Sequence, residues 1–264
     1  MVRTLRLFAA FFGQFLKRRM AYRSNFWIQV LALAVWSLAN LLLIHTLFQA
    51  VPTIRGWTRG EVFLIYGVAN CSFAFGFTLF YNVFKLPGRY IVEGHLDLLM
   101  VRPFNPLLQL LMEDFSAEDS LMFFFGLAVV AYGFGLIGVD PGTGTWLLTL
   151  LMVVSGGLVY GGILLAGASL SFWFKDRVGL AGALVEAGDQ VAKYPLTIYP
   201  TALRVFLSTL LPFGFVAFYP AQVLLPEPSN LLLGLAAPAV GVGMMALAYG
   251  IWSQGLRMYE SAGS

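Results

Sequence analysis

The sequence predicts an all-α, polytopic membrane protein, and three observations carry this prediction. Hydrophobic residues make up 59% of the 264 residues and charged residues only 11%, whereas soluble domains carry roughly 25% charged residues. The mean hydropathy is +0.80. Finally, Asp, Glu, Lys and Arg are absent from 26–48, 62–84, 120–139, 142–174, 205–226 and 228–256. Because about 20 mostly apolar residues form a bilayer-spanning helix, we expect one transmembrane domain over 1–264.

Several function classes are excluded by composition. No basic tract extends beyond Lys17-Arg18-Arg19, so we expect no nucleic-acid partner. Cys71 is the only cysteine and is interpreted as a small packing residue. The two histidines, His45 and His95, are expected on opposite sides of the membrane and cannot share a metal. With no phosphate-binding loop and no nucleophile–base pair, we expect neither a cofactor nor a catalytic site.

The first half of the chain is predicted to begin with an interfacial helix. Apolar residues recur at helical spacing in 4–19, and the basic residues before the first span place this segment (1–24) in the cytoplasm. Asn25 is the expected cap of that span. Six spans are predicted. Five of them are 26–49, 61–84, 120–139, 145–174 and 230–253, and the remaining one, the fifth in chain order, lies in the region 178–229. An even number of spans leaves both termini in the cytoplasm, and we expect the protein to reside in the cytoplasmic (inner) membrane.

The course of residues 178–229 has two interpretations. In the first, 178–194 crosses the membrane and 195–229 dips in from the outer side and returns. In the second, 178–204 stays cytoplasmic and 205–226 crosses. The uncharged length favours the second, but four prolines between 195 and 220 would break a single long helix. We prefer the first.

The segment 85–119 is expected to hold a short, well-defined helix on the cytoplasmic side. The proline after Arg102 ends one helix, and Asn105 before Pro106 begins another, over about 106–115. That helix presents Leu107, Leu108, Leu110 and Leu111, which need a surface to bury against. Docking on a cytoplasmic partner is the functional interpretation, and packing on the membrane surface is the alternative. Ser116 and Asp119 have the spacing of a capping box that opens the next span.

Charged residues of the predicted fifth span share one helix face. Glu186, Asp189 and Lys193 are separated by three, four and seven positions, and each charge is costly in lipid. We therefore expect this face to line a polar path or a subunit seam, with a purely local Asp189–Lys193 ion pair as the alternative. The small residues of 157–167 are interpreted as a site of close helix packing within the chain, with a dimer seam as the alternative.

The order of three motif groups resembles the membrane subunit of type-2 ABC exporters, the ABC-2 permease family. The first group is Gly94-His95-Leu96-Asp97-Leu98-Leu99 with Arg102-Pro103-Phe104-Asn105-Pro106-Leu107. The second is Tyr194-Pro195-Leu196-Thr197-Ile198-Tyr199-Pro200, followed by Leu211-Pro212-Phe213 and Tyr219-Pro220-Ala221. The third is Phe15-Leu16-Lys17-Arg18-Arg19-Met20-Ala21-Tyr22-Arg23 before the first span. The resemblance is spread across residues 10–225.

The resemblance implies a permease with no catalytic role of its own. It implies six spans, an N-terminal interfacial helix, a coupling helix between spans 2 and 3, and a re-entrant segment before the last span. A cytoplasmic ABC ATPase dimer would drive two such permeases, homologous or identical, in the membrane lipid. The residues assigned to ATPase coupling are Asp97, Arg102, Asn105, Leu107 and Leu110.

Two other functions are compatible with the same sequence. An ion-coupled secondary transporter would use Glu186 and Asp189 and need no ATPase, but such proteins carry internal repeats that are not evident here. A membrane scaffold explains the hydrophobicity but not the proline-rich segment 194–226. The expected substrate is amphipathic or lipid-like.

Overall fold

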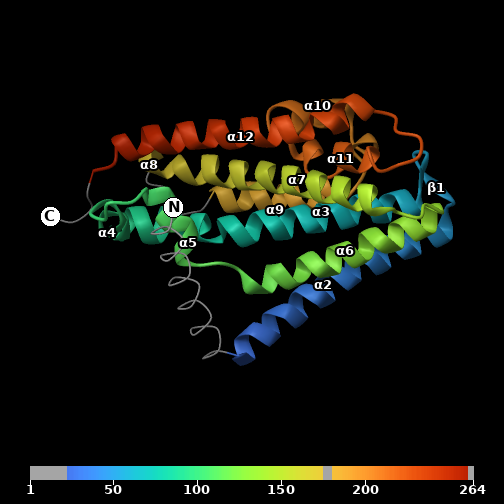
Figure 1. Cartoon of the computed structure of the whole chain (residues 1–264), viewed down its shortest axis with the longest axis horizontal. Helices are drawn as coiled ribbons and strands as arrows, with labels where there is room; N and C mark the ends of the chain where they lie inside the picture. The colour runs from blue at the N-terminus through green and yellow to red at the C-terminus, as the bar shows by residue number, and fades with distance from the viewer. Residues whose placement is uncertain (1–22, 175–179, 261–264) are drawn as a thin grey trace.

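The computed structural model describes residues 23–174 and 180–260, and the predicted N-terminal interfacial helix lies outside these ranges. Within them the protein is an elongated helical bundle (Figure 1). Five helices are long and apolar enough to cross a membrane. These are α2 (Arg23–Ala50), α3 (Arg59–Phe80), α6 (Ala117–Ile137), α7 (Thr143–Ser169) and α12 (Leu231–Arg257). Their positions confirm the predicted spans, although Asn25 lies inside α2 rather than capping it.

The helix α3 is the centre of the bundle and packs against both α6 and α7. Small residues allow this approach: a Cβ on Gly76 would lie 2.6 Å from the carbonyl oxygen of Gly157, and one on Gly161 would lie 2.4 Å from the Phe80 ring. On the other side of α7, a Cβ on Gly162 would lie 2.8 Å from the Met244 side chain in α12. The small-residue stripe of α7 therefore packs within the chain, as predicted.

A β-hairpin joins α2 to α3 and marks one end of the bundle, which we call the hairpin end. Its strands β1 (Thr53–Ile54) and β2 (Trp57–Thr58) pair antiparallel, with Thr53 opposite Thr58. Arg55 and Gly56 make the turn with φ of 52° and 87°. The sequence predicted only a loop here, since two-residue strands are too short to show an alternating pattern.

The opposite end of the bundle carries a compact set of short helices, which we call the elbow (residues 81–116). The central helix continues through η1 (Tyr81–Lys85) and η2 (Leu86–Val92), which have 3₁₀ and π geometry. The elbow then folds back through α4 (His95–Met100) and α5 (Pro106–Glu113) before α6 begins. The predicted break near Arg102 and the predicted helix start at Pro106 are confirmed, while α5 ends two residues earlier than expected because Asp114 is extended.

The described part of the region 178–229 begins near the elbow and runs along α9 to the hairpin end, where its part 195–229 starts and ends (Figure 1). It comprises α9 (Leu180–Ala192), η3 (Leu196–Ile198), α10 (Thr201–Thr209), η4 (Phe213–Phe215) and α11 (Phe218–Gln222), and it follows α8 (Ser171–Phe174). The helix α9 packs against α7 and its 13 described residues rise about 20 Å. Beyond it, the Trp57 indole donates to the Thr197 hydroxyl over 2.7 Å.

The bend between α10 and the η4–α11 pair is 73°, so residues 205–226 do not form one straight crossing helix. After α11 the chain starts α12 beside it, because Gly234 lies against Tyr219 and Val223. Both ends of the segment 195–229 therefore lie at the hairpin end. The path of 195–229 agrees with the first interpretation, whereas the crossing of the membrane by 178–194 stays a prediction, since the described part of α9 is not among the helices long enough to span it.

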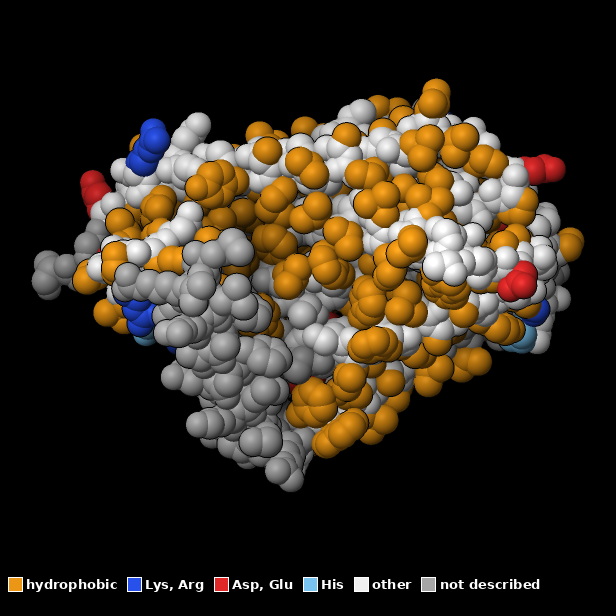
Figure 2. All heavy atoms as spheres, viewed as in Figure 1, with side chains coloured by type: hydrophobic (Ala, Val, Ile, Leu, Met, Phe, Trp, Pro, Cys, Tyr) orange, Lys and Arg blue, Asp and Glu red, His pale blue; other side chains and the backbone are white. Residues whose placement is uncertain are grey.

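The first long helix stands apart from the others. In Figure 1, α2 meets the bundle near the hairpin end and diverges from α3 toward its own N-terminus. Of the most apolar 18-residue stretch of α2, only 11% is buried inside the chain. Charged side chains of the face seen in Figure 2 gather at the two ends of the long axis, and hydrophobic side chains cover the middle. This distribution fits a bundle that lies across a bilayer.

Candidate functional site

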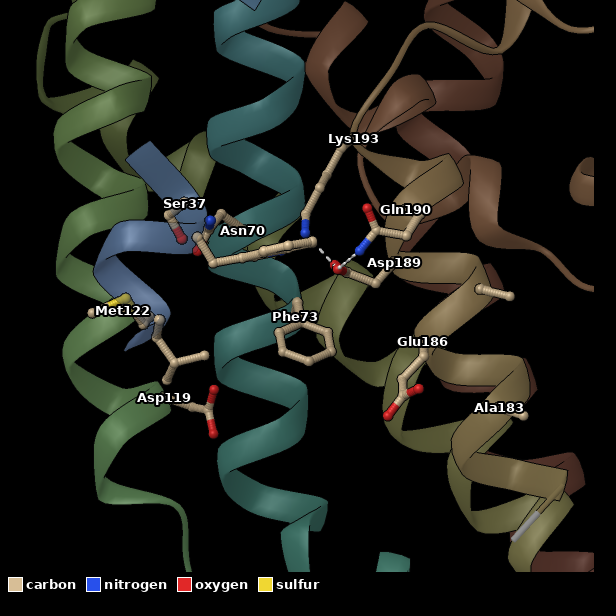
Figure 3. A pocket seen from close by; sticks show the side chains of 13 residues that line it. Ser37, Asn70, Phe73, Asp119, Met122, Ala183, Glu186, Asp189, Gln190 and Lys193 are labelled. Carbon is tan, nitrogen blue, oxygen red and sulfur yellow. Dashed lines mark hydrogen bonds and ion pairs between the residues drawn. The ribbon is translucent and has the colours of Figure 1, made fainter. Parts of the chain in front are cut away.

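A cavity of about 870 Å³ lies between α2, α3, α6 and α9. The divergence of α2 from α3 creates it, and Figure 3 shows its side chains converging from several helices. Its lining comprises Leu33, Trp36, Ser37, Asn70, Phe73, Asp119, Met122, Ala183, Glu186, Ala187, Asp189, Gln190 and Lys193. Glu186, Asp189 and Lys193 thus share one helix face, as their spacing predicted, and all three line this cavity.

Lys193 and Asp189 form a buried ion pair on one wall of this cavity. Their side chains are only 7% and 10% exposed, so the lysine is committed to this carboxylate. The Tyr160 hydroxyl of α7 donates to Asp189 Oδ1 over 3.1 Å, and the Gln190 amide donates to Oδ2 over 3.4 Å. A buried charge needs a partner and further hydrogen bonds to be tolerated, and Asp189 has both.

Glu186 differs from Asp189 although it lies one helical turn away. Its residue is exposed, and its carboxylate points into the cavity (Figure 3). No other residue of the described chain forms an ion pair or hydrogen bond with it. The carboxylate is therefore available to a molecule in the cavity.

Asp119 faces the cavity from the opposite wall, at the first turn of α6 (Figure 3). The Ser116 hydroxyl donates to this carboxylate and also accepts from the Asp119 backbone N–H over 3.4 Å, so the predicted cap of this span is confirmed. Sequence reasoning identified the cap but missed the cavity position. Helical spacing relates residues on one helix only, and Asp119 and Glu186 come from different helices.

Aromatic and apolar side chains form the remainder of the lining. Trp36 is 57% exposed, while Phe73 stacks on Phe77 at 5.1 Å and meets the Tyr160 ring edge-on at 5.3 Å. Phe73 is therefore held in place by two other rings. The cavity combines a few carboxylates with fixed apolar surfaces, which is the usual composition of a small-molecule site.

The elbow places the predicted coupling residues outside the cavity. The Asn105 side chain caps α5 by accepting from the N–H groups of Leu107 and Leu108 at 2.9 and 3.3 Å. Asp97 lies in the first turn of α4 and is half-buried, whereas Arg102 is exposed in the break between the two helices.

The expected orientation of two leucines is wrong. Leu107 and Leu110 are 7% and 0% exposed and belong to the hydrophobic core of the chain itself. The reason is that α5 folds back onto η1, where the Leu110 carbonyl accepts from Asn82 over 2.8 Å. The buried amide of Gln109 fixes the same orientation by donating to the carbonyl oxygens of Leu99 and Phe104.

Of the four leucines expected to face a partner, only Leu108 is exposed, and three other apolar residues of α4 and of the link to α5 are exposed as well. Val101 is 85% exposed, and Leu98, Met100 and Leu108 are 62%, 45% and 45% exposed. We call these four residues the elbow patch. They belong to α4, α5 and the link between them, so the two helices present them on one compact unit.

Polar contacts hold the end of α5 against η1 and η2, the short helices that continue α3. Lys85 pairs with Asp114 at 2.7 Å, and the buried Asn82 amide donates to the Tyr90 hydroxyl over 2.6 Å. That hydroxyl donates in turn to the carboxylate of Glu113 at the end of α5. A displacement of α5 would therefore displace the end of the central helix.

Comparison with curated proteins and with solved structures gave no match to either. The family model described as ABC-2 family transporter protein matches residues 34–263. This range holds all five long helices except the beginning of α2, together with the elbow, the cavity and the re-entrant segment. The chain therefore belongs to the ABC-2 transporter family and is a membrane permease of that type.

Proposed function

We propose that this permease is the membrane subunit of an exporter driven by separate cytoplasmic ABC ATPase subunits. The elbow patch is the observation that supports this proposal most directly. Val101 and Leu98 expose most of their apolar surface on a unit that also carries the polar Arg102 and Asn105. Exposed apolar patches with polar rims are typical of protein interfaces.

The construction of the elbow supports a mechanical role. The amide of Gln109 ties the end of α4 to α5, and the Lys85–Asp114 pair ties the end of α5 to η1, which continues α3. A partner that moves the elbow patch when it binds ATP would thus move α3, which also lines the cavity through Asn70 and Phe73. ATP binding can drive transport only if the two arrangements of this contact differ in free energy.

The same proposal fixes the orientation of the protein. The elbow end, with Lys85, Arg89 and Arg102, faces the cytoplasm, and the hairpin end faces outward, as the positive-inside rule favours. Both termini are then cytoplasmic in the inner membrane. A second permease, homologous or identical, completes the assembly within the membrane lipid.

The ion-coupled alternative has less support. It requires Glu186 and Asp189 to exchange ions, but Asp189 is held by Lys193 and Tyr160. Only Glu186 remains for that role. Nothing in the cavity favours this alternative over ATP-driven transport.

The elbow patch can be tested with two aspartate variants, Val101→Asp and Leu108→Asp. Each places a carboxylate where an apolar contact is proposed, and burying it unpaired costs about 2 kcal/mol or more, so co-purification of an ABC ATPase encoded beside the permease should fall at least tenfold. Vanadate-sensitive ATP hydrolysis in the complex, and transport per ATP, are measured in parallel.

Gly142→Asp is the matched control. Gly142 is the exposed N-cap of α7 at the hairpin end, and a Cβ there meets no atom within 4 Å. Aspartate is a favourable N-cap residue, so this variant adds the same charge without strain. If Val101→Asp and Leu108→Asp bind and couple like Gly142→Asp, the proposed contact is refuted.

A further inference from the structure

The cavity has an unusual charge arrangement for a site in an apolar bundle. Its described lining contains three carboxylates and one ammonium group, and the ammonium group of Lys193 is bound to Asp189. Glu186 points into the space without a partner of its own in the described chain. No cationic side chain of the described lining is left to bind an anionic group.

The apolar walls of the cavity are suited to the apolar part of a bound molecule. Trp36 exposes more than half of its side chain, and Phe73 is fixed by Phe77 and Tyr160. Aromatic faces attract organic cations through their quadrupole, by about 0.5–2 kcal/mol. The volume of about 870 Å³ suits a drug-sized molecule, for which sites span roughly 300–1,000 Å³.

We propose that the cavity binds a lipophilic organic cation. Its charged centre lies beside Glu186, and its apolar part lies against Trp36 and Phe73. That the protein exports such a molecule rests on the function proposed above, but the binding itself does not.

Two other ligand classes fit the cavity less well. A metal ion needs several converging oxygen or nitrogen ligands, and no group of three metal-binding side chains occurs among the described residues. An anionic amphiphile would place its charge beside Glu186, where no cationic side chain of the described lining compensates the repulsion. The chemistry of the lining therefore selects a cation with a large apolar surface.

A pair of probes with the same shape and opposite charge provides the test. Tetraphenylphosphonium is a lipophilic cation, and tetraphenylborate is an anion of almost the same size and shape. Binding of each to the full-length permease in lipid nanodiscs is measured by equilibrium dialysis, with empty nanodiscs subtracted. We expect saturable binding of tetraphenylphosphonium and none of tetraphenylborate.

Glu186→Gln should weaken the binding of tetraphenylphosphonium about five- to tenfold, because it removes the charge and keeps the size of the side chain. Glu186→Asp keeps the charge and should retain most of the affinity, which separates loss of charge from loss of fold. Glu227→Gln is the control, since Glu227 is exposed in the link between α11 and α12. This control should bind like the unaltered protein.

Three results would overturn the proposal. These are equal saturable binding of both probes, binding of tetraphenylborate alone, and an affinity for tetraphenylphosphonium that does not change in Glu186→Gln. The outcome is independent of the elbow experiment, because no ATPase is present. Binding without ATPase coupling would leave the cavity site intact and refute only the exporter.

Discussion

Replacing Lys193 by Met should destabilise the protein strongly, because it strands the buried carboxylate of Asp189. Both side chains of this pair are about nine-tenths buried, and removing one partner of a buried pair costs about 3–5 kcal/mol. The Tyr160 hydroxyl and the Gln190 amide still donate to Asp189. We therefore expect the lower end, about 3 kcal/mol, which corresponds to a fall in Tm of roughly 6–12 °C for a chain of this size.

The assay is thermal unfolding of the purified protein in one detergent. Unfolding is monitored as the loss of the monodisperse peak in size-exclusion chromatography after heating. The matched control is Lys85→Met, because Lys85 and Asp114 form a more exposed pair, at 28% and 24%. Such a pair contributes about 1 kcal/mol or less. The double variant Lys193→Met/Asp189→Leu removes the stranded charge and should recover most of the lost stability. If Lys193→Met shifts Tm no more than Lys85→Met, or if the double variant is no more stable than the single one, the reasoning fails.

Two further predictions follow from the packing and the topology. Gly76→Ala should lower stability by about 1–3 kcal/mol in the same thermal assay, because the added Cβ meets the Gly157 carbonyl oxygen at 2.6 Å. The control Gly243→Ala adds a Cβ with no atom within 4 Å and should be neutral or stabilising. A larger loss of stability in Gly243→Ala than in Gly76→Ala would contradict the packing argument. With Cys71 replaced by Ala, single cysteines at Thr201 and at Ser229 should both react with a membrane-impermeant maleimide added to intact cells from outside. Reaction of the cysteine at Thr201 only after the cells are opened would contradict the re-entrant path.

The long helices could be predicted from the sequence because lipid imposes a simple rule. A charged side chain in the middle of a span costs several kcal/mol, so uncharged stretches mark the spans without any knowledge of their partners. The caps at Asn105 and Ser116 were predictable for a different reason. Capping is local, and the side chain meets backbone N–H groups only two or three residues away.

The orientation of the elbow could not be predicted in the same way. In α5 the polar Gln109 is buried and the apolar Leu108 is exposed, the reverse of what side-chain polarity indicates. The carbonyl oxygens of Leu99 and Phe104, which lie outside α5, make the burial of Gln109 favourable. Sequence periodicity carries no information about such acceptors, and for this reason Leu107 and Leu110 were expected on the wrong face.

The central helix links the two regions that carry the proposals. Phe73 of α3 lines the cavity, and Asn82, where the helix has changed to 3₁₀ geometry, binds the Leu110 carbonyl of α5. The nine positions from Phe73 to Asn82 correspond to a rise of about 13 Å as a helix, and close contacts with α6 and α7 restrict bending along α3. We therefore expect a displacement of the elbow to move this wall of the cavity. A binding site on that wall would change shape when the elbow moves, which is the requirement for coupling a cytoplasmic event to a ligand inside the bundle.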